Sequence, residues 1–318
     1  MSVNLITYIL SFVGIWIGSG IAIRSVEKLS RILRISSFVV SFLVLGLFTS
    51  VSELSVGVNS IIAHDPEIFV GNLIGASIVL FILVIPLLAI VGNKIKIAPE
   101  FQGFNLPMSL IVVAVPVLLA IDGQITQTDS IISVGLYGFL AIIIEAKKGI
   151  TRKFKNFTPD ATVRVEKEIL KIIFGLVLIF IASKFVVNQT LYFADILKVS
   201  PFLVSLIVIS IGTNVPELSL VARSVFMKDN EVAFGDYIGS AAFNTFLIGF
   251  LTIINGGSVP LNNSYLISLL FLIAGLVLFY HFARTKNSIS RLEGLALLFL
   301  YALFLFVEVV VHRKALGI

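Results

Sequence analysis

Two glutamates, Glu53 and Glu217, stand 164 residues apart, each inside a segment apolar enough to cross a lipid bilayer. A carboxylate at the centre of a membrane helix costs roughly 2.5–3.5 kcal/mol on the insertion scale. Both glutamates belong to copies of one pattern: over 36–80 against 200–244, with no gap, 16 of 45 positions are identical. A chain that repeats so costly a residue at matched positions is expected to use the two carboxylates together.

Other oxygen-bearing side chains surround each glutamate in the sequence. In the second copy, Gly212 and Pro216 predict a broken helix, because proline removes one helical hydrogen bond. On the next apolar segment Asp236, Ser240 and Asn244 recur every four residues, so they share one face of a helix. The remaining candidates in the two copies are Thr49, Ser50, Asn72, Ser77, Thr213 and Asn214.

An all-oxygen set of this kind predicts a site for hard cations such as Ca²⁺, which take six to eight oxygen ligands. The chain has no cysteine. His64 is expected in a loop, His281 at a helix end and His312 in the C-terminal tail, so a zinc or copper site is disfavoured. No cofactor is expected; the ions are cargo.

The composition is that of an integral membrane protein. The chain is 58% hydrophobic and only 13% charged, whereas soluble domains carry about 25% charged residues. No basic patch is interleaved with stacking aromatic residues, which argues against nucleic-acid binding. The expected partners are inorganic cations and the lipid bilayer, with no obligatory protein partner.

Ten apolar segments of spanning length form two groups of five, with a basic linker between them. We expect a first five-helix repeat over 1–146, a cytoplasmic linker over 147–167 and a second repeat over 168–318. The segments are 4–23, 37–62, 68–92, 105–121, 130–146, 169–193, 201–227, 232–254, 263–282 and 292–311.

The distribution of lysine and arginine predicts the orientation in the cell membrane. With both termini outside, 19 of the 23 basic residues fall on the cytoplasmic side or beside it. Since five is odd, the two repeats then have opposite orientations, which is typical of many secondary transporters whose site lies near the midplane. Lys184 is a further charge inside a span, and its role stays open.

The pattern Gly-Thr-Asn-Val-Pro-Glu-Leu at 212–218, followed by Gly-Asp-Tyr-Ile-Gly-Ser at 235–240, resembles the repeats of the cation/calcium exchanger superfamily, and most of all its prokaryotic sodium/calcium exchangers. The resemblance implies an all-α fold of ten transmembrane helices in two inverted repeats, with helices 2 and 7 broken at the midplane. It also implies that the segments at 4–23 and 169–193 are the sliding, gate-forming pair.

The same resemblance implies a set of ion ligands. Glu53 and Glu217 match the two ion-binding glutamates of the family, and its backbone carbonyl ligands, one turn before Thr49 and Thr213, would come from Gly46 and Ser210. The matching hydroxyl and amide ligands are Thr49, Ser50, Thr213, Asn214, Ser240 and Asn244, and the two repeats further offer Asp236, Asn72 and Ser77.

The first half departs from the family pattern. Ala76 and Leu80 stand opposite Ser240 and Asn244 and offer no ligand. Two more motif positions differ, with Phe48 in place of glycine and Ser52 in place of proline, and Asp236 stands where asparagine is usual. The calcium position keeps both glutamates, whereas one or more sodium positions are expected to be missing.

These features predict an antiporter that exchanges Ca²⁺ for a monovalent cation, with Na⁺ first and an H⁺/Ca²⁺ antiporter as the alternative. A cation channel is the alternative of another class. An intramembrane enzyme is disfavoured, because the cluster offers no nucleophile–base pair and no histidine. The sequence leaves open the coupling ion, the stoichiometry, the direction of transport and the oligomeric state.

Overall fold

The computed structural model describes residues 2–33, 46–97, 103–146, 159–215, 217–218 and 230–315. Most of these residues are helical, and each strand has only two or three residues. Seven described helical segments are long and apolar enough to cross a membrane, and three shorter apolar helices accompany them. The chain is therefore a multi-pass, all-helical membrane protein.

The elements follow the predicted apolar segments in order. The first half contains α1 (Ser2–Leu33), α3 (Gly46–Thr49), α4 (Val51–Ile62), α5 (Glu67–Val79), the π-helical turn η2 (Leu80–Val84), α6 (Ile85–Val91), β1 (Lys94–Lys96), α7 (Asn105–Leu119), the 3-10 turn η4 (Ala120–Asp122), β2 (Gln124–Ile125) and α8 (Gln127–Ala146). The second half contains α9 (Pro159–Leu197), α10 (Pro201–Val204), the π-helical turn η6 (Ser205–Ile209), α11 (Ser210–Thr213), α13 (Asn230–Ile254), β3 (Val259–Pro260), α14 (Leu266–Lys286), β4 (Ser288–Ser290) and α15 (Arg291–Ala315).

Three predicted boundaries differ from the structure. Helix α9 begins at Pro159, so the last part of the predicted linker is helical, while 147–158 lies outside the described residues. Helix α1 continues to Leu33, beyond the apolar segment that ends at 23. His312 belongs to α15 and not to a tail. Hydropathy marks the part of a helix that lies in lipid, whereas charged residues such as Lys and Glu let the helix continue beyond it.

The two halves repeat small structural details at the same offset of 164 residues. The backbone N–H of Thr126 donates to Asp129 Oδ2 (2.8 Å) ahead of α8, and the N–H of Ser290 donates to Glu293 Oε2 (2.7 Å) ahead of α15. In both cases the hydroxyl of the first residue also contacts the carboxylate, at 2.7 Å. The same hydrogen-bonded helix start therefore occurs in both halves, although threonine and aspartate form it in the first half and serine and glutamate form it in the second.

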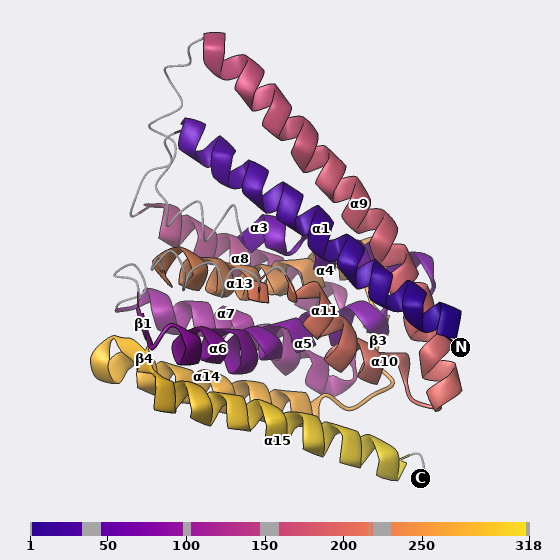
Figure 1. Ribbon diagram of the computed structural model, residues 1–318. Helices are drawn as coiled ribbons and strands as arrows, with labels where there is room; N and C mark the ends of the chain where they lie inside the picture. Colours follow the sequence, from indigo (N-terminus) through magenta and orange to yellow (C-terminus); the bar gives the residue numbers. More distant parts are fainter. Residues whose placement is uncertain are drawn as a thin grey trace.

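Two short strand pairs join the halves. Strand β1 pairs antiparallel with β4, and β2 pairs antiparallel with β3, so each pair takes one strand from each half. Strands β1 and β4 lie at one end of the bundle, and β3 lies at the other end, where α1 begins and α15 ends (Figure 1). A strand pair therefore connects the two halves at each end of the bundle.

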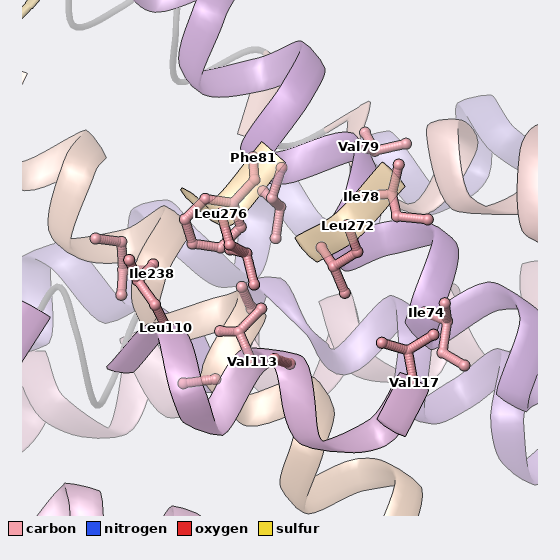
Figure 2. Close-up of a cluster of buried hydrophobic side chains, with 14 of the residues drawn as sticks. Ile74, Ile78, Val79, Phe81, Leu110, Val113, Val117, Ile238, Leu272 and Leu276 are labelled. Carbon is pink, nitrogen blue, oxygen red and sulfur yellow. The ribbon is translucent and has the colours of Figure 1, made fainter. Parts of the chain in front are cut away.

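The interior of the bundle is formed by α5 and α13, with α7 and α14 packed against them. In an 18-residue apolar stretch of α5–α6, and in one of α13, 78% of the residues are buried. In the corresponding stretches of α8 and α15 only 28% are buried. Ile74, Phe81, Val113, Ile238 and Leu272 belong to one cluster of buried hydrophobic side chains in this core (Figure 2). Helices α1 and α9 lie side by side at the edge of the bundle (Figure 1), and α9 also packs against α4.

Candidate functional site

Both motif-bearing segments depart from regular helix at one residue. Ser50, between α3 and α4, has φ −78° and ψ 7°, and Asn214, directly after α11, has φ −87° and ψ 9°. These angles belong to the bridge region and not to the α region, where ψ lies near −40°. The two residues are equivalent in the two halves, so each motif interrupts its helix three residues before its glutamate. Pro216, from which the second break was predicted, lies outside the described residues.

The two glutamates lie close together in the interior. Both are fully buried, and they are near enough for their carboxylates to repel each other. Ser52 Oγ donates to Glu53 Oε2 (2.9 Å), and Ser240 Oγ donates to Glu217 Oε1 (3.4 Å). In the part of the chain that the structure describes, neither glutamate forms an ion pair with lysine or arginine. A buried charge without such a partner is costly, so this pair calls for a cation or a proton.

A crossed pair of threonines links the halves. Thr49 Oγ1 donates to Asp236 Oδ1 and Thr213 Oγ1 donates to Asn72 Oδ1, both at 3.4 Å. Each threonine also faces the glutamate of the other half. These four side chains, all fully buried, place the two halves around the carboxylates in the same way.

The serine and amide candidates form two more contacts between the halves. Ser50 Oγ and Ser240 Oγ lie 2.9 Å apart, which connects the first break to the Glu217 carboxylate through Ser240. Asn244 Nδ2 donates to Ser77 Oγ at 3.4 Å. Among the described hydrogen bonds, this last pair makes none to either glutamate, so it stands at the edge of the cluster.

The predicted backbone ligands are engaged by their own helices. The carbonyl of Gly46 accepts from Ser50 Oγ (2.8 Å), and the carbonyl of Ser210 accepts from Asn214 Nδ2 (2.7 Å). The two contacts are equivalent in the two halves. A cation that used either carbonyl would compete with a donor one turn away on the same helix.

Close helix crossings bring these oxygens together. A Cβ on Gly46 would lie 2.8 Å from the backbone of Gly239, and a Cβ on Gly75 would lie 2.8 Å from the Cβ of Ser210. Both crossings therefore need glycine, as in other small-residue helix contacts in membranes. They bring each motif helix against the interior helix of the opposite half.

Four oxygen atoms in the cluster have no hydrogen-bond donor among the described residues. They are Glu53 Oε1, Glu217 Oε2, Asn214 Oδ1 and Asn244 Oδ1. An unsatisfied buried acceptor costs about 1–3 kcal/mol, and a bound cation would remove that cost. No group of three or more His, Cys, Asp or Glu side chains lies together in the described ranges. A divalent ion would therefore draw on hydroxyl, amide and carbonyl oxygens beside the two carboxylates.

The loss of ligands in the first half is visible in the fold. Ala76 and Leu80 are both fully buried, at the positions equivalent to Ser240 and Asn244. Leu80 opens the π-helical turn η2, for which α13 has no counterpart. The cluster is therefore symmetric in its glutamates and threonines and asymmetric in its outer ligands.

Two residues of the cluster were not among the predicted ligands. Ser52 contacts Glu53, and Tyr237 Oη donates to the backbone carbonyl of Glu217 (3.1 Å). Ser52 was marked only as a departure from proline, and Tyr237 stands inside the 235–240 motif. Lys184 is exposed on α9 and has no described hydrogen bond or ion pair. Ion binding by the thirteen predicted residues stays a prediction, although the structure brings most of them into one cluster.

Comparison with known proteins gives consistent matches. The family model described as sodium/calcium exchanger protein matches residues 3–144 and 167–310. The sodium/calcium exchanger MaX1 of Methanosarcina acetivorans is 24% identical, over 96% of this chain and 99% of its own length. The inner membrane protein YrbG of Escherichia coli is 24% identical, over 77% of this chain and 78% of its own.

Two solved structures share the fold. The sodium–calcium exchanger NCX_Mj superposes with a TM-score of 0.68 at 22% identity, covering 95% of this chain and 97% of its own. The H⁺/Ca²⁺ exchanger CAX superposes with a TM-score of 0.75 at 16% identity, covering 98% of this chain and 88% of its own.

Proposed function

Because this chain belongs to the sodium/calcium exchanger family, we propose that it is a secondary active antiporter that exchanges Ca²⁺ for Na⁺ by alternating access. One observation carries the proposal: two buried glutamates, one from each half, lie together without a described basic partner. Each keeps one carboxylate oxygen without a hydrogen-bond donor. The family consists of transporters and not of enzymes, which agrees with the lack of a nucleophile–base pair.

The ligands of the proposed site come from both halves. Glu53 and Glu217 supply the charge that Ca²⁺ needs, and neutral oxygens complete the shell. The neutral and additional ligands in the proposal are Thr49, Ser50, Thr213, Asn214, Ser240, Asn244, the carbonyls of Gly46 and Ser210, and Asp236, Asn72 and Ser77.

Exchange follows from competition for one pair of carboxylates. One Ca²⁺, or else monovalent ions, neutralises the glutamates, and the loaded site then crosses an apolar barrier at lower cost. An empty site with two negative charges is held back by the desolvation penalty. Since the two loads exclude each other, movement of one ion requires return of the other.

We place the site at the midplane of a ten-helix inverted repeat, with repeats at 1–146 and 168–318 joined by the 147–167 linker. Helices 2 and 7 are the broken helices, interrupted at Ser50 and Asn214. Support comes from the basic residues, of which 19 of 23 favour one side. In the proposed orientation the protein lies in the cell membrane with both termini outside and the linker in the cytoplasm.

A proton-coupled exchanger is the second candidate, favoured by Ala76 and Leu80. Their side chains supply no oxygen at two positions where the second half has Ser240 and Asn244. With fewer ligands for Na⁺, protons at the carboxyl groups would serve as the opposing load. The cation-channel alternative gains no support, since MaX1, NCX_Mj and CAX are all named as exchangers.

Imposed gradients separate the two candidates. Purified protein in vesicles loaded with ⁴⁵Ca²⁺ is given either a sodium gradient at equal pH or a pH gradient without sodium. Release driven by sodium alone assigns Na⁺, and release driven by the pH gradient alone assigns H⁺. Release that needs neither opposing ion would contradict exchange.

Replacing either glutamate with glutamine should abolish Ca²⁺ flux, because the amide keeps the shape and removes the charge. We expect Glu53→Gln and Glu217→Gln to lose sodium- or proton-driven ⁴⁵Ca²⁺ uptake while eluting as a single species in size-exclusion chromatography. Glu166→Gln, on the exposed part of α9, is the matched control and should retain uptake. Uptake that persists in either site variant would overturn the assignment.

A further inference from the structure

Ser52 stands at the junction of the two halves, at the position where the second motif has Pro216. It belongs to the first turn of α4 and is fully buried. We propose that Ser52 is a positioning residue, which orients the Glu53 carboxylate for ion binding. This inference rests on the proposed exchange function and adds a residue to it.

The contacts of the Ser52 hydroxyl are all to oxygen atoms. Its Oγ lies 2.9 Å from Glu53 Oε2, 3.0 Å from the carbonyl of Thr49 and 3.3 Å from the carbonyl of Thr213. A serine hydroxyl has only one proton to donate. The carboxylate is the strongest of the three acceptors, because hydrogen bonds to a charged partner are shorter and stronger.

The two oxygens of the Glu53 carboxylate therefore have different roles. Glu53 Oε2 is held by Ser52, whereas Glu53 Oε1 has no donor among the described residues. One oxygen fixes the carboxylate, and the other remains available to a cation. Ligands held in place before the ion arrives bind it more tightly than ligands that must first be ordered.

The equivalent position in the second half cannot act in this way. Pro216 has no hydroxyl, and the described hydrogen bond to the Glu217 carboxylate comes from Ser240 on α13. The first half has alanine where the second half has that serine. Ser52 thus supplies from within the motif the donor that Ala76 cannot supply from the neighbouring interior helix.

The test is Ca²⁺ affinity in vesicles and in detergent. In Ser52→Ala we expect the KM for Ca²⁺ to rise about tenfold, as for loss of a hydrogen bond to a charged group, with the maximal rate changed less than twofold. Ser52→Thr keeps the hydroxyl and should restore the KM. Ser52→Pro, which installs the residue of the second motif, should resemble the alanine variant. Calorimetric titration of purified protein with Ca²⁺ should show the same order of affinities.

The matched control is Ser60→Ala. Ser60 is equally buried on the same helix, but its hydroxyl bonds only locally, to the carbonyl of Gly57 at 2.8 Å. We expect its KM to stay at the wild-type value. An unchanged KM in Ser52→Ala, or no recovery in Ser52→Thr, would refute the inference while leaving exchange itself established. Absence of Ca²⁺ exchange in the wild type would refute the proposed function instead.

Discussion

At the level of single residues, equivalent positions keep the same contact while the chemistry of the partner changes. Thr49 donates to Asp236 on α13 and Thr213 donates to Asn72 on α5, in each case at 3.4 Å and to the interior helix of the opposite half. The carboxyl group of Asp236 stands where the first half has the amide of Asn72, so the two sides of the cluster differ in chemistry although their contacts are equivalent.

A second acidic pair lies where α4 meets α5, with Asp65 in the turn outside the spanning segments and Glu67 at the start of α5. Burial, and to a smaller degree the nearby Glu67, raise the pKa of Asp65. A carboxyl group with a raised pKa in the folded state binds protons more readily there than in the unfolded chain, so it lowers stability as the pH rises. We expect Asp65→Asn to raise the melting temperature at about pH 8, by a margin that shrinks as the pH is lowered toward 4. A constant margin across the titration would contradict this assignment, and thermal unfolding in detergent measures it.

At the level of elements, helix α1 packs closely against the second motif at Gly212. A Cβ on Gly212 would overlap the ring of Phe12, which packs at a tilt against Tyr8 on the same helix, with ring centroids 5.0 Å apart. The equivalent first-half position is Phe48. Only the second motif therefore has a glycine at the position where a side chain of α1 packs.

Closing that gap should disturb both stability and transport. We expect Gly212→Ala to cost about 1–3 kcal/mol, as overpacking usually does, and to slow Ca²⁺ exchange because α1 is displaced from the motif. The double variant Phe12→Ala with Gly212→Ala should recover part of both. Gly135→Ala on α8, where a Cβ would meet nothing within 4 Å, is the control. A Gly212→Ala protein with wild-type melting temperature and rate would show that the contact is unimportant.

The sequence predicted a multi-pass, all-helical membrane protein, because hydropathy reports directly on lipid exposure. It did not predict the ends of α1 and α9 or the placement of His312, since helices continue into water through residues of good helix propensity. The interruption at Ser50 was expected only from the likeness to the second motif, because the first copy lacks proline. The hydrogen bonds donated by Ser52 and Tyr237 were missed because the partner of a side-chain hydrogen bond leaves no periodic signal in the sequence.

At the scale of the whole molecule, the two strand pairs fix which ends of the halves meet. Lys94 pairs with Ser290 in one sheet, and Gln124 pairs with Pro260 in the other. In the proposed orientation the first pair lies on the cytoplasmic side and the second outside. Glu53 and Glu217 were expected to lie close together because they occupy matched positions in two copies of one pattern.

The absence of cysteine from the sequence makes this arrangement directly testable. Single cysteines at Lys94 and Lys96, both exposed on β1, should react with a membrane-impermeant maleimide only after the cells are opened. Cysteines at Gln124 and Asn263 should react in intact cells. Labelling of both sets from the same side would contradict the proposed orientation.

The strand pairing has a consequence for descent. In the sequence repeat, β3 is equivalent to β1 and β4 is equivalent to β2. Strand β1 pairs with β4 and β2 pairs with β3, so each pair joins the same two kinds of strand. Two identical half-length chains, inserted in opposite directions, would make the same contacts as an isologous dimer. Their ion site would sit on the two-fold axis, with one glutamate from each subunit. A dimer of identical chains would carry every residue on both sides of that axis, whereas in the single chain Asp236, Ala76 and Ser52 each stand on one side only.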